Sequence, residues 1–177
     1  MKKINTKALV QTAILLAICI ASQFLKNLSV YITGPIINAC LAIAAMSAGL
    51  GYAVILSVIT PITSFIITGS PIMAAVPAII PCVMVGNAVY VIAIALIGKR
   101  KWKAAFPVSM AVGSVLKALF MGVVISLILV PMLLPEKMQP MMHTVQMTFS
   151  VTQLVTAAIG SVYAFIIWIP LKKVNKE

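Results

Sequence analysis

The most constraining feature of this sequence is a long segment without any charged side chain, which begins after Lys26 and ends at Lys99. The whole chain has 177 residues, of which 63% are hydrophobic and only 8% are charged. Because a water-soluble domain has about 25% charged residues, this chain has too few of them to cover a surface that faces water. We therefore predict an integral membrane protein that lies in the lipid bilayer.

Loop and turn motifs divide the chain into segments that can cross a membrane, for which about 20 apolar residues are needed. These motifs are "YITGP" (residues 31–35), "SAGLGY" (47–52), "TGSP" (68–71), "GKRKWK" (98–103) and "PMLLPEKMQPMMH" (131–143). They predict one membrane domain, residues 1–177, an all-α bundle of six transmembrane helices over residues 8–25, 36–48, 52–67, 72–97, 104–131 and 145–169. Pro77 and Pro81 are expected to kink the fourth helix or to confine its regular structure to the second part.

Basic residues are distributed unevenly around these six segments. Six crossings place most of them on one side of the membrane, namely Lys2, Lys3, Lys7, the four cations of residues 99–103, Lys172, Lys173 and Lys176. Only Lys26 and Lys137 fall on the other side. Since positively charged loops stay in the cytoplasm, we predict that both termini are cytoplasmic. This pattern also accounts for the net charge of +11 without a nucleic-acid partner.

Acidic residues are nearly absent, because the sequence contains only Glu136, in a predicted outer loop, and Glu177 at the C-terminus. Carriers coupled to protons or sodium commonly bind the coupling ion with carboxylates inside the membrane, so we do not expect this chain to energise transport alone. It also lacks HExxH and GxSxG motifs and any pair of aspartates that could hold a metal. We therefore expect no catalytic residue, no metal site, no cofactor and no enzymatic activity.

Lys117 is the one charged residue inside a predicted span, near the middle of residues 104–131. At a rise of about 1.5 Å per residue it lies close to the membrane midplane, where a cation is costly and faces the bundle interior or a wet cavity. We interpret it as a counter-charge for an anionic ligand, such as a carboxylate or phosphate. The alternative is a lysine that lies nearer the interface or is held by carbonyl groups at a helix end.

Uncharged polar residues at membrane depth are the other candidates for substrate binding. They are Asn38, Thr60, Asn87, Gln146 and Gln153. Each of them could instead form hydrogen bonds between helices, which in membrane proteins contribute about 0.6 kcal/mol on average. Together with Lys117 and the proline-rich outer loops, they favour a small-molecule site that opens to the outside.

Ala13, Ala17 and Ala21 are spaced four residues apart in the first predicted helix, so they share one face. Because lipid tails are as apolar as leucine, transmembrane helices associate through close packing of small residues. The three alanines therefore predict a contact face. Its partner is either another helix of the same bundle or a separate protein.

The size of the chain, its six helices with both ends inside, the lack of intramembrane carboxylates and the line of Ala13, Ala17 and Ala21 together resemble one family. It is the substrate-binding S components of energy-coupling factor (ECF) vitamin transporters. The segments "GPIINACLAIAAMSAGLGYAVILSVITPITSFI" and "PAIIPCVMVGNAVYVIAIALIGK" are also similar to that superfamily. The resemblance implies a binding subunit in the bacterial plasma membrane that captures a vitamin or related micronutrient outside the cell. An anion such as pantothenate, another carboxylate vitamin or an amino acid such as tryptophan would suit Lys117.

The same resemblance implies partners. The subunit would dock on a transmembrane coupling protein driven by two cytoplasmic ATPases, with Ala13, Ala17 and Ala21 packed against the coupling protein. The ligand would lie under the outer loops at residues 26–35, 68–76 and 131–144. Two alternatives remain at this point, a stand-alone ion-coupled secondary carrier of a small molecule and an assembly subunit without a ligand.

Overall fold

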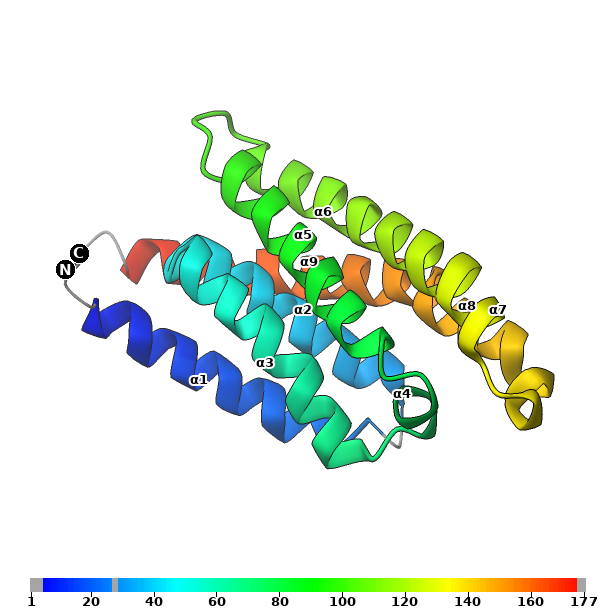
Figure 1. Cartoon of the computed structure of the whole chain (residues 1–177). Helices are drawn as coiled ribbons and strands as arrows, with labels where there is room; N and C mark the ends of the chain where they lie inside the picture. Colours follow the sequence, from blue (N-terminus) through cyan, green and yellow to red (C-terminus); the bar gives the residue numbers. More distant parts are fainter. Residues whose placement is uncertain (1–4, 27–28, 175–177) are drawn as a thin grey trace.

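The computed structural model describes residues 5–26 and 29–174, and within these ranges the chain is helical without strands (Figure 1). The elements are α1 (Thr6–Gln23), α2 (Val30–Ser47), α3 (Leu50–Thr68), α4 (Pro71–Ala75), α5 (Ile79–Ile97), α6 (Ala105–Met121), the π-helix η1 (Gly122–Leu129), α7 (Val130–Leu133), the 3-10 helix η2 (Glu136–Met141), α8 (Met142–Phe149) and α9 (Val151–Val174). Six helical stretches in this part of the chain are long and apolar enough to cross a membrane. The prediction of an all-α bundle of six transmembrane helices is confirmed.

The predicted turn at residues 31–35 is wrong, because α2 already begins at Val30. The Ser29 hydroxyl accepts a hydrogen bond from the backbone N–H of Tyr31 at 3.1 Å and thereby caps the helix before the "YITGP" motif. Pro35 lies inside the helix and is buried, so this proline does not end α2. Helix two is therefore a full-length span of 18 residues rather than the short segment 36–48.

The prolines of the fourth segment confine regular structure to its second part, as the sequence predicts. The short helix α4 ends at Ala75, and α5 begins at Ile79, after Pro77. Pro81 lies in the first turn of α5, where its missing N–H has no partner to lose. The break forms a compact cap at this end of the bundle, which we call the α4 end (Figure 1).

The last two spans also differ from the predicted limits of 104–131 and 145–169. The fifth runs over α6, η1 and α7 and ends at Leu133. The sixth is broken at Ser150, whose backbone angles (φ −116°, ψ −88°) separate α8 from α9. The fifth span is thus longer than predicted and the sixth is interrupted, and the apolar content of the sequence predicts neither feature.

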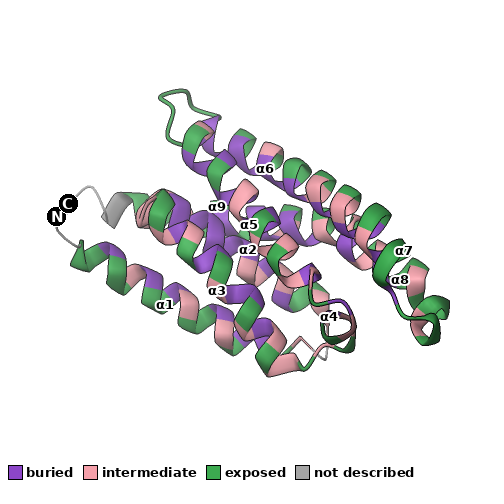
Figure 2. Cartoon of the chain, viewed as in Figure 1, coloured by how far each residue is buried: buried purple, intermediate pink, exposed green. Residues whose placement is uncertain are grey.

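Helix α2 lies at the centre of the bundle and packs against α1, α3, α5 and α9. Its residues from Asn38 to Ala45 are buried, and Leu41, Ala42, Ala44 and Ala45 are completely inaccessible. Figure 2 shows buried residues on the inward faces of the helices and exposed residues on the outward faces, where apolar side chains would meet lipid. The start of α1, the end of α9 and the basic loop at residues 99–103 share the end opposite to the α4 end (Figure 1).

The crossing of α2 and α9 depends on Gly160. A Cβ atom at this position would lie 2.6 Å from the Pro35 carbonyl oxygen and 2.7 Å from the Asn38 Cβ, and the backbone contact cannot yield. We expect Gly160→Ala to destabilise the protein by about 1–3 kcal/mol through overpacking, measured as a lower midpoint of thermal unfolding in detergent. Gly51→Ala is the matched control, because nothing lies within 4 Å of its added Cβ. Equal midpoints for the two variants would contradict this close crossing.

Candidate functional site

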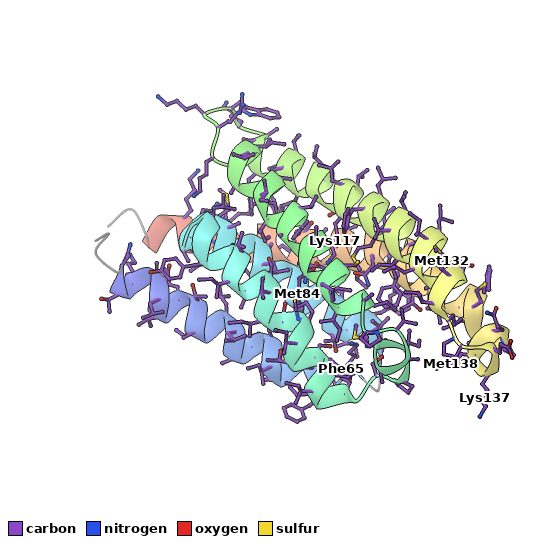
Figure 3. The ribbon with its side chains drawn as sticks, viewed as in Figure 1. Phe65, Met84, Lys117, Met132, Lys137 and Met138 are labelled. Atoms are coloured by element: carbon purple, nitrogen blue, oxygen red, sulfur yellow. The ribbon has the colours of Figure 1, made fainter. Side chains whose placement is uncertain are left out.

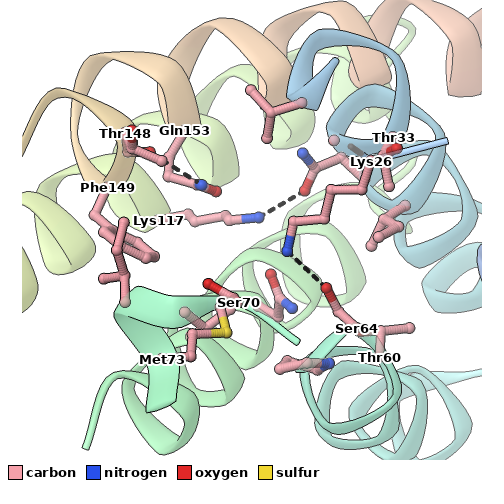
Figure 4. A pocket seen from close by; sticks show the side chains of 18 residues that line it. Lys26, Thr33, Thr60, Ser64, Ser70, Met73, Lys117, Thr148, Phe149 and Gln153 are labelled. Atoms are coloured by element: carbon pink, nitrogen blue, oxygen red, sulfur yellow. Dashed lines mark hydrogen bonds between the residues drawn. The ribbon is translucent and has the colours of Figure 1, made fainter. Parts of the chain in front are cut away.

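A cavity of about 150 Å³ lies inside the bundle near the α4 end (Figure 4). Its walls come from α2, α3, α4, α5, α6, α8 and α9 and from the connections that follow α1 and α3. Five of the six predicted substrate-binding residues line it, namely Asn38, Thr60, Asn87, Lys117 and Gln153. These residues are far apart in the sequence, and only the packing of the helices brings them together.

Lys117 projects from α6 into the interior of the bundle, where only 3% of its surface is exposed (Figure 3). Its ammonium group donates a hydrogen bond to the Asn38 Oδ1 atom on α2, with a distance of 2.7 Å. It also lies 5.8 Å from the centre of the Tyr90 ring, within the range of a cation–π contact. The cation is therefore held by neutral groups, which leaves its charge free to attract an anion.

Lys26 is a second cation in the same cavity, and it was not among the predicted binding residues. It follows α1, and its ammonium group donates a hydrogen bond to the Ser64 hydroxyl on α3 at 2.7 Å. Burial lowers the pKa of Lys26 from its ordinary value, since the charged form loses hydration. The sequence does not single it out, because a lysine directly after a span usually extends to the lipid headgroups.

Uncharged polar groups surround the two lysines. The Thr60 Oγ1 atom is buried and has no hydrogen-bond partner among the described residues. The side chain of Asn87 is 4% exposed and borders the cavity. On the opposite wall, the Gln153 amide donates to the Thr148 carbonyl oxygen at 3.3 Å. A buried polar group without a partner is costly, so Thr60 is poised for a ligand or a water molecule.

Gln146 does not line this cavity, although it was a predicted binding residue. Its amide donates to the Ser126 carbonyl oxygen at 2.9 Å, and the Ser126 hydroxyl donates to the Gln146 carbonyl oxygen at 2.8 Å. These reciprocal bonds join η1 to α8. Gln146 therefore forms hydrogen bonds between helices, which is the alternative role that the sequence left open for it.

The described residues that line the cavity include two positively charged side chains and no negatively charged one. Both acidic residues of the chain are distant in sequence from its lining, and no carboxylate lines it among the residues that the structure describes. The same part of the chain has no cluster of His, Cys, Asp or Glu that could hold a metal ion. Two ammonium groups with uncharged hydrogen-bonding neighbours have the chemistry to pair with an anion.

The three alanines of α1 lie outside the bundle. Ala13, Ala17 and Ala21 are all exposed, whereas Leu15 and Cys19 on the other face of α1 are buried. The structure thus rules out the first of the two partners considered above, a packed helix of the same bundle. The alanine face is free for lipid or for another protein.

These features define the class of the protein, a membrane-embedded binding protein with an internal cavity for a small molecule. The chain matches the family model described as "ECF transporter, substrate-specific component" over residues 7–172, so it belongs to this family. Members of the family are substrate-binding transport subunits rather than enzymes, and they work with a membrane coupling protein and two ATPases. No curated protein and no solved structure gives a significant match to this chain.

Proposed function

We propose that this protein captures a small anionic micronutrient, such as a carboxylate vitamin of the pantothenate type, at the outer face of a bacterial plasma membrane. The observation that carries this proposal is the cavity near the α4 end, with the buried Lys117 and no carboxylate in its described lining. A buried ammonium costs several kcal/mol unless it is paired. Binding of an anion supplies that pairing and offsets part of the cost.

The orientation of the bundle supports capture from outside. The basic loop at residues 99–103 lies opposite to the α4 end (Figure 1), and positively charged loops stay in the cytoplasm. The cavity then lies near the outer surface, next to residues 26–35 and 68–76, two of the three segments where the resemblance places the ligand. The third, residues 131–144, contributes none of the described lining residues, although α8, which begins within it at Met142, contributes Thr148 and Phe149.

Delivery inward requires the partners of the family. We infer that Ala13, Ala17 and Ala21 pack against the transmembrane coupling protein, because they form an exposed strip of small side chains on a spanning helix. Such a strip lets a neighbouring backbone approach closely. ATP would be bound by the two ATPases.

Native mass spectrometry of the full-length protein, purified from cells that express the coupling protein and the ATPases, tests this function. We expect complexes that contain the partners and a saturable small-molecule ligand on this chain. Uptake into vesicles by the purified chain alone would support the stand-alone secondary carrier instead. Absence of any retained small molecule would favour an assembly subunit.

A further inference from the structure

Two lysines share one cavity, and this pairing goes beyond the role of Lys117. Lys26 enters from the connection after α1 and reaches towards α3, whereas Lys117 enters from α6 and reaches towards α2. Figure 4 shows both side chains directed into the cavity from different walls. Each is held through an uncharged acceptor, the Ser64 hydroxyl or the Asn38 amide oxygen. Since an ammonium group has three donors, each retains hydrogen-bonding capacity for a ligand.

The charge balance of the cavity limits what can fill it. Like charges repel strongly where water is scarce, and no carboxylate among the described lining residues compensates the two cations. A ligand with one negative charge leaves one ammonium unpaired in a partly buried site. A ligand with two negative charges neutralises both lysines, so it gains the most from this arrangement.

The size and lining of the cavity limit the ligand further. Its volume is about 150 Å³, and Phe149 is the only aromatic side chain among the described lining residues. A large aromatic ring system would find little stacking surface there. The polar side chains Asn87 and Thr60 suit oxygen-bearing groups instead.

We propose that the substrate is a compact, non-aromatic organic dianion, a dicarboxylate or a phosphate monoester, and that Lys26 and Lys117 each bind one of its negative charges or share its doubly charged group. This inference rests on the proposed function and narrows it, because it specifies a doubly charged ligand for the same cavity in place of a singly charged carboxylate such as pantothenate. Lys26 is assigned here as a second binding residue that determines specificity for charge.

The test uses the full-length protein in lipid nanodiscs and, as its probe, the small-molecule extract of growing cells. Native mass spectrometry measures the ligand retained by the unaltered protein and by Lys26→Met, Lys117→Met and Lys137→Met. Lys137 is the matched control, because it is an exposed lysine at the same end of the bundle and lies outside the cavity (Figure 3). Accurate mass and phosphorus NMR of the released ligand distinguish a dicarboxylate from a phosphate monoester.

We expect a retained ligand with two acidic charges. Its retention should fall about tenfold or more in Lys26→Met and in Lys117→Met, since each loses a charge-assisted hydrogen bond, and should stay within about twofold in Lys137→Met. A retained ligand with a single negative charge would overturn this inference and leave the proposed capture of a small anion standing. A retained ligand that is neutral or cationic would overturn both the inference and the anionic character of the proposed substrate. The inference alone is overturned if Lys26→Met retains the ligand as well as Lys137→Met does. If the unaltered protein retains no ligand, the proposed function itself fails.

Discussion

Replacing Lys117 with methionine is expected to weaken ligand binding about 10- to 100-fold while leaving the fold intact. The substitution keeps an unbranched side chain of similar length but removes the ammonium group, and a hydrogen bond to a charged group contributes about 1.5–3 kcal/mol. Because Lys117 is 3% exposed, its removal also relieves the cost of a buried charge. Thermal stability without ligand should therefore stay the same or rise. Isothermal titration and thermal unfolding of the purified variant measure the two effects.

A loss of affinity without a loss of thermal stability separates a ligand-binding role of Lys117 from a structural one. If Lys117 only joined α6 to α2 through Asn38, methionine would lower stability and affinity together. Asn38→Leu serves as a second variant, since it removes the 2.7 Å hydrogen bond to Lys117 but keeps the cation. Unchanged affinity in Lys117→Met would show that the ligand does not use this charge.

Replacing Ala17 with tryptophan is expected to abolish transport by the whole complex and to preserve ligand binding. Ala17 lies in the middle of the exposed strip that also contains Ala13 and Ala21. A bulky ring there would hold a docked helix away from α1 and remove the close packing on which membrane helices depend. The cavity is lined from the connection after α1 and from other helices, with no contribution from the alanine strip, so affinity should not change. Co-purification with the coupling protein and ligand uptake in cells measure the outcome.

Ala111→Trp is the matched control for this experiment. Ala111 is also an exposed alanine on a spanning helix, but it belongs to α6, which lies across the bundle from α1 (Figure 1). We expect this variant to retain co-purification and uptake. If Ala17→Trp loses ligand binding or fails to fold, the strip supports the bundle itself. If it still co-purifies at the level of Ala111→Trp, the coupling protein docks elsewhere.

The number of transmembrane helices could be predicted from the sequence, whereas several of their limits could not. Apolar length identified six spans, because lipid requires each span to satisfy its backbone hydrogen bonds internally. The turn predicted at "YITGP" is wrong because Ser29 caps α2 ahead of this motif and the helix continues through Pro35. The break at Ser150 was also missed, because it lies inside the segment that apolar content assigned to a single span, residues 145–169.

Some residues of the candidate site could likewise be predicted from the sequence, and others could not. Lys117 could be found from the sequence alone, because a charge in the middle of an apolar span has few explanations. Lys26 could not be, since a lysine directly after a span usually extends to the lipid headgroups, and only its contact with Ser64 on α3 directs it inward. Gln146 and Gln153 looked equivalent in the sequence, yet the first pairs with Ser126 and the second reaches the cavity.

The sequence alone therefore determined that this protein lies in the lipid bilayer, how many helices cross it, which family the chain belongs to, and which charged residue lies inside a span. These properties follow from the composition of each segment and from the spacing of residues within it, so they do not depend on how the helices pack. The tertiary structure decided which polar side chains meet in the cavity and that the alanine strip faces outward. Those outcomes depend on the rotation of each helix about its axis and on close crossings such as that of Gly160 with α2. Packing between distant segments sets both, and no single segment encodes them.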